Sequence, residues 1–176
     1  MTAISDTTVS PVIVSTGKTV TPFSLVTVSD PLQATENVSV TLGRYYYYPY
    51  RYYQQQTDLG SLKDPLGGGS FDPTTNTFTE SAFVTGTPTP ATQILNRLVY
   101  TPPALSDGSA TAVSASVSVS GVADAKPVLV ETVTPPAVTG TVADEPVASG
   151  GTIRPFGIVQ VADYNFCNSQ APPRSS

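Results

Sequence analysis

Valine and alanine alternate with serine over residues 113–120, which read VSASVSVS. Successive side chains of a β-strand point to opposite faces of its sheet, so this pattern predicts a strand with one buried and one solvated face. Burial on one face only is typical of antiparallel sheets. Weaker alternation predicts further strands over 9–14, 19–28, 36–42 and 127–133.

Turn-forming residues separate the predicted strands. Proline, glycine, aspartate and serine cluster at 29–31, 67–69, 72–73, 102–103 and 106–109. Only 12% of the residues are charged, which is about half the usual share. Many short strands with such punctuation predict an all-β fold, an antiparallel Ig-like or cadherin-like β-sandwich.

The segment TPATQILNRL over 89–98 departs from the alternation. Thr89 is a residue type that caps helices, and Pro90 suits the first helical position. The apolar residues Ile94, Leu95 and Leu98 follow at helical spacing. We expect one short helix here, closing one end of the sandwich, with a strand after it at 99–101.

Two stretches far apart in the chain are nearly the same. Residues 14–30 read VSTGKTVTPFSLVTVSD, and residues 147–163 read VASGGTIRPFGIVQVAD. Self-similarity of this kind is typical of modules arranged in series. We therefore divide the chain into a sandwich module over 1–133 and, over 134–176, a linker with a partial second repeat that serves as an assembly extension.

The partial repeat predicts an interaction by strand pairing. An exposed strand edge is a template for another strand. A strand over 151–162 would extend a sheet edge, either in its own molecule or in a neighbouring one. The residues expected to make this contact are Ile153, Phe156, Ile158, Val159 and Val161.

A tyrosine-rich insertion over 43–58 is the second candidate contact region. Tyrosine supplies a large apolar area together with a hydroxyl that can stay hydrated, and it is enriched at interfaces. We expect a protein–protein contact surface; a glycan site and self-packing on the sandwich are the alternatives. The residues concerned are Arg44, Tyr45, Tyr46, Tyr47, Tyr48, Tyr50, Arg51, Tyr52 and Tyr53.

Composition excludes several classes of function. The formal charge is −5 and no basic cluster is present, which argues against binding to nucleic acid. The N-terminus shows no Sec-type signal peptide, and no apolar run approaches the ~20 residues of a membrane span. The single cysteine, Cys167, cannot form an internal disulfide.

The residue pattern of an enzyme is missing. Without histidine there is no Ser-His-Asp or Cys-His pair, and 15–19 lacks the first glycine of a phosphate-binding loop. We expect no catalysis and no cofactor. An isolated calcium site on acidic residues at strand ends is the alternative to solvated turn acids, and its candidates are Asp30, Asp107, Asp124 and Asp163.

Several segments occur in an order that resembles the repeated cadherin-like or immunoglobulin-like modules of large bacterial surface proteins of the adhesin type. They read TPFSLVTVSDP, ENVSVTL, LGGGSFD, TPATQILNRLVYTP and VSASVSV. The resemblance covers about 14–133 and restarts at 136–163. It implies a sandwich used for spacing and adhesion, without catalysis.

We therefore expect a structural protein that assembles with copies of itself or with other structural proteins. It would be a subunit of a virion surface, such as a capsid decoration or tail, or of an extracellular filament. The alternative is an adhesion module that binds a host glycan or receptor.

Overall fold

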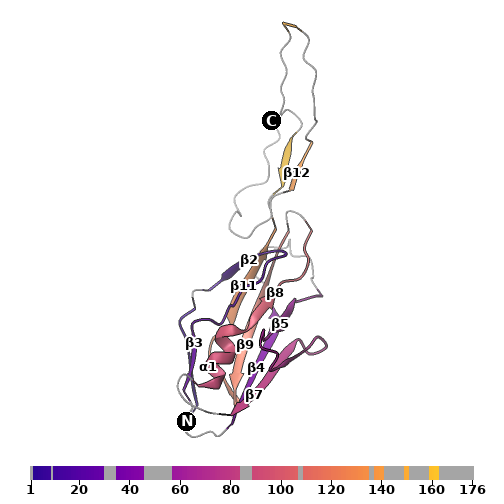
Figure 1. Cartoon of the computed structure of the whole chain (residues 1–176). Coiled ribbons are helices and arrows are strands. Elements are labelled where there is room, and N and C mark those ends of the chain that lie inside the picture. The colour runs from indigo at the N-terminus through magenta and orange to yellow at the C-terminus, as the bar shows by residue number, and fades with distance from the viewer. Residues whose placement is uncertain are drawn as a thin grey trace.

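The largest element of the computed structural model is a seven-stranded sheet with the order β2-β11-β9-β4-β7-β6 and with β10 paired to β9 (Figure 1). The residues described are 2–8, 10–29, 35–45, 57–83, 89–106, 109–134, 137–140, 149–150 and 159–162. The strands of the large sheet are β2 (Val12–Ser15), β4 (Thr35–Arg44), β6 (Ser70–Asp72), β7 (Thr77–Phe83), β9 (Ala110–Val119), β10 (Val122–Ala123) and β11 (Val128–Val133).

Three antiparallel two-stranded ladders and one helix complete the described fold. The first ladder pairs β1 (Ala3–Asp6) with β3 (Val26–Ser29). The second pairs β5 (Ser61–Lys63) with β8 (Val99–Thr101), and the third pairs β12 (Ala137–Thr139) with β13 (Gln160–Ala162). The helix is α1 (Pro90–Arg97).

The alternation predicted the two faces of the large sheet correctly. In β9, Val113, Ala115, Val117 and Val119 are buried, and Ser116 between them is exposed. Because β4 and β9 pair in register, the alternation of β4 places its valines on the same face as those of β9. The opposite face carries mainly serine and threonine.

The core lies between this sheet and a second layer built from α1 and the first two ladders. Phe23 and Val26 reach it from the side of β3, Leu95 from α1 and Tyr100 from β8, and all four are fully buried. The fold is thus an all-β, sandwich-like structure with one short helix, as the sequence predicted. Its second layer is interrupted by the helix, which occupies space that a strand would fill in a continuous sheet.

Three details differ from the expectations. The strand expected over 19–28 is divided by a turn at 22–25, because Pro22 fixes its φ angle and the Val26 N–H donates to the Phe23 carbonyl at 3.0 Å. Strand β2 pairs with β11 in parallel rather than antiparallel. Helix α1 contacts β3, β4 and β7, so it lies across the face of the sheet and not at its end (Figure 1).

Candidate assembly interface

Strand β3 is held between a strand and a helix end. One of its edges pairs with β1, from Ala3 opposite Ser29 to Asp6 opposite Val26. On the other edge the Val28 N–H donates to Thr92 Oγ1 at 2.8 Å. The Val28 carbonyl accepts from the hydroxyls of Thr89 and Thr92, each at 3.2 Å. Two threonine side chains of α1 therefore replace a neighbouring strand.

The same helix also fastens the turn before β3. With the nitrogen of its amide facing the turn, Asn96 donates to the carbonyls of Phe23 at 2.9 Å and Val26 at 3.0 Å. Thr89, Thr92 and Asn96 are spaced so that they share one face of the helix. We call this set the α1 polar face. It binds main-chain groups, whereas the apolar side chains of the β3 segment enter the core beside it.

The C-terminal ladder repeats the N-terminal one in register. In the first ladder Ala3 pairs with Ser29 and Ile4 with Val28. In the third, Ala137 pairs with Ala162 and Val138 with Val161. The sequence repeat matches Val28 with Val161, and Ala137 matches Ala3 when one residue is omitted before Gly150. Both copies of the repeat thus form the same strand pair.

The two ladders differ in what surrounds them. The Val28 side chain is 6% exposed, because α1 and the sheet cover it. The Val161 side chain is 64% exposed. In Figure 1 the β12·β13 ladder lies beyond the end of the large sheet, away from α1. The second copy therefore presents an apolar side chain that the first copy buries.

Four of the predicted contact residues fall in the part of the chain that the structure describes. Arg44 and Tyr45 lie at the end of β4, where Arg44 pairs with Val113 and the Tyr45 N–H donates to the Ala112 carbonyl at 3.3 Å. Val159 and Val161 lie at β13. The others lie outside the described residues: Tyr46, Tyr47, Tyr48, Tyr50, Arg51, Tyr52, Tyr53, Ile153, Phe156 and Ile158.

The two candidate contact regions leave the sandwich at the same end. Strand β9 pairs with Arg44 through Val113 and with Val133, the last residue of β11, through Ala110. The tyrosine-rich insertion therefore starts close to where β11 continues toward β12. Sequence separation alone gave no indication of this proximity.

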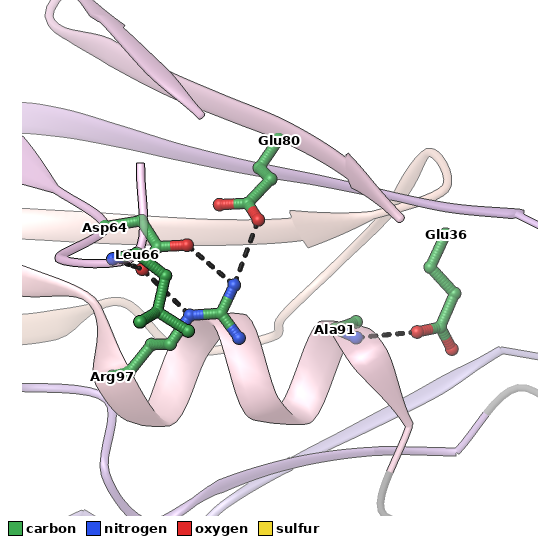
Figure 2. A network of polar contacts seen from close by, with 6 residues as sticks. All are labelled: Glu36, Asp64, Leu66, Glu80, Ala91 and Arg97. Atoms are coloured by element: carbon green, nitrogen blue, oxygen red, sulfur yellow. Dashed lines mark hydrogen bonds and ion pairs between the residues drawn. The ribbon is translucent and has the colours of Figure 1, made fainter. Parts of the chain in front are cut away.

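A buried charged cluster, which the sequence did not predict, joins α1 to the large sheet (Figure 2). Arg97 donates through Nε to Asp64 Oδ1 at 2.8 Å and through Nη2 to Asp64 Oδ2 at 2.6 Å. Its Nη2 also donates to Glu80 Oε1 at 3.0 Å. The side chains of Asp64 and Glu80 are 0% and 5% exposed. Two carboxyl groups thus share one guanidinium in a nearly dry site.

The shared guanidinium divides the acidities of the two carboxyl groups. The hydrogen bonds from Arg97 lower the pKa of Asp64 to about 2. Burial, followed by the neighbouring Asp64, raises the pKa of Glu80 to about 7. Gly68 leaves room for this arrangement, because a Cβ atom at that position would overlap Glu80 Oε1.

A second buried carboxylate fixes the other end of the helix. Glu36 in β4 is fully buried, and its Oε2 accepts from the Ala91 N–H at 2.7 Å (Figure 2). Thr89 Oγ1 accepts from the Thr92 N–H at 3.3 Å, which makes Thr89 the cap that the sequence predicted. Both groups satisfy N–H donors that lack partners inside the first turn of a helix.

One of the four acids considered for calcium, Asp124, lies in the described part. Its backbone N–H donates to the Val117 carbonyl at 2.8 Å, and its Oδ1 accepts from the Lys126 N–H at 3.4 Å, as in a turn. Asp30, Asp107 and Asp163 lie outside the described residues. Within the described ranges, no three His, Cys, Asp or Glu residues are grouped so as to hold a metal ion. Among the same residues, no helix is long and apolar enough to cross a bilayer.

The α1 polar face and the charged cluster were both missed at the sequence level. The available signal was the polar pattern inside 89–98, where Thr92, Asn96 and Arg97 interrupt the apolar positions. A short helix with so many polar residues needs partners for them elsewhere in the fold. The identity of those partners depends on tertiary contacts across dozens of residues.

The chain matches no protein-family model, no curated protein and no solved structure.

Proposed function

We propose that this protein is a non-enzymatic structural subunit that assembles through the β12·β13 ladder, as part of a virion surface or an extracellular filament. The observation that supports the proposal is the shared register of the two ladders, combined with the exposure of Val161. A strand pair that buries its valine in one copy has the chemistry to bury it in the other.

The location of the core supports this division of labour. All the buried hydrophobic side chains among the described residues lie between Val14 and Val130. The β12·β13 ladder adds none of them. It is therefore available for contacts outside the sandwich, and the tyrosine-rich insertion starts near the same end of the large sheet.

The experiment compares the full chain with a variant truncated after residue 136. Both are followed by sedimentation velocity over a range of concentrations and by electron microscopy. We expect the truncated variant to keep the thermal unfolding transition of the sandwich, since the core is intact, and to lose higher-order assembly. Equal assembly of the two chains would contradict the proposal.

A further inference from the structure

We infer that β13 of one copy exchanges for β3 of another and docks on the α1 polar face, Thr89, Thr92 and Asn96, of that second copy. The inference deepens the proposed function and rests on it, because it identifies the surface that the β12·β13 ladder contacts. The occupant of the exposed ladder is thus a second copy of this chain.

The receptor side of this contact is present in every copy. The α1 polar face binds β3 through the Val28 N–H, the Val28 carbonyl and the carbonyls of Phe23 and Val26. These are all main-chain groups, so they do not depend on the side chains of the bound segment. Selection comes from the core beside them, which holds Phe23 and Val26 fully buried and Val28 at 6% exposure.

The ligand side carries the side chains that this core selects. The repeat places Val159 where the first copy has Val26, and Val161 where it has Val28. The pairing with β12 reproduces the pairing of β3 with β1. Neither surface brings a charged residue to the contact, so the exchange buries no unpaired charge.

Exchange of equivalent elements between copies is domain swapping, which creates few new contacts and therefore costs little in contact energy. In the second copy, β13 replaces a strand of the same register and the same apolar positions. Its own β3 competes for the site with the advantage of being attached to the same chain. Weakening β3 alone must therefore shift the balance toward the neighbour's β13.

The test is made in the full chain with Val28→Ala. This change removes apolar contacts from β3 and leaves β13 intact, so association should tighten about tenfold in sedimentation equilibrium. Adding Val161→Asp should abolish the gain. Val122→Ala, at a residue that is 39% exposed, is the matched control and should leave association as in the wild type. No gain from Val28→Ala, or a gain that survives Val161→Asp, overturns the inference.

A second measurement does not depend on the stability of the Val28→Ala variant. A chain with Thr92→Cys is mixed with a chain with Val161→Cys, both in a Cys167→Ser background, and oxidised. We expect a disulfide-linked heterodimer, and none when Thr79→Cys, on the exposed face of β7, replaces Thr92→Cys. Absence of the heterodimer overturns the inference as well.

The two proposals fail separately. If truncation after residue 136 abolishes assembly but the cysteine pair does not cross-link, the assembly role stands and the exchange on α1 is wrong. If truncation leaves assembly unchanged, the assembly role itself is wrong.

Discussion

Glu36 Oε2 accepts a hydrogen bond of 2.7 Å from the backbone N–H of Ala91, which lies 55 residues further along the chain. The carboxylate comes from β4 in the middle of the large sheet, and the N–H comes from the first turn of α1. A negative group at a helix N-terminus is favourable because the helix dipole and the free N–H groups both point toward it. The contact fixes where the only described helix meets the sheet.

Replacing Glu36 by alanine should destabilise the fold by about 2–4 kcal/mol, because it leaves a cavity and a buried N–H without a partner. Glu36→Gln keeps an acceptor oxygen of the same reach and should cost less. The measurement is urea unfolding followed by circular dichroism. Ser116→Ala, on the exposed face of β9, is the control and should change the unfolding free energy by no more than about 0.5 kcal/mol.

The shifted pKa of Glu80 predicts a pH dependence of stability. The folded protein holds the Glu80 proton up to about pH 7, whereas the unfolded chain releases it near the ordinary value of 4.5. Between these values the unfolded state binds fewer protons, so the unfolding free energy falls as the pH rises, by roughly 2–3 kcal/mol in total. The lowered pKa of Asp64 works in the opposite direction, and its contribution is lost as the pH falls from 3.8 toward 2.

Chemical denaturation at several pH values tests this expectation. Glu80→Gln should remove the fall in stability between pH 4.5 and 7, because the amide keeps an acceptor for Arg97 and carries no titrating proton. Asp72→Asn, at an exposed turn, should keep it. A Glu80→Gln profile that still falls like the wild type would show that another group is responsible.

Tyr100→Phe should lower the unfolding free energy by about 1 kcal/mol. The Tyr100 hydroxyl, which is fully buried, donates to the Leu59 carbonyl at 2.9 Å, and phenylalanine leaves that carbonyl unpaired. Burial raises the pKa of Tyr100 to about 12, so the wild type loses stability as the pH rises from 10 to 12. The variant should lose less over the same interval. An unchanged alkaline profile would contradict this account.

Changing Tyr45, Tyr46, Tyr47 and Tyr48 together to serine tests the tyrosine-rich insertion. Because the described contact of Tyr45 with β9 is made by its backbone, the sandwich should keep its unfolding transition. We expect assembly to weaken, as measured by sedimentation. If assembly is unchanged but binding to a glycan array is lost, the adhesion hypothesis is the better one.

Local patterns were enough to predict the strands and the helix. The alternation of valine and serine in 113–120 identified the buried face of β9, and Thr89 with Pro90 placed the start of α1 correctly. These signals depend on residues that are close in sequence. The direction of β2 could not be predicted in this way, because its partner β11 lies more than one hundred residues away.

The interface was predictable only in part. Identity of the repeats indicated that 159–162 would form the strand that 26–29 forms, and the matching registers agree with this. The role of Thr92 and Asn96 could not be predicted, since a hydroxyl or an amide in a helix gives no information about which backbone it will meet. Likewise, Asp64, Glu80 and Arg97 are ordinary surface residue types until the fold buries them together.

The two threonines that complete β3 have a consequence for how copies of this protein can be stacked. Most strand edges carry a row of free N–H and C=O groups that invites another strand to join sideways. At Val28 that row is already closed by Thr89 and Thr92, so the layer cannot widen at this edge. Growth is thereby directed along the axis of the chain, which favours a thread of units over a sheet of them.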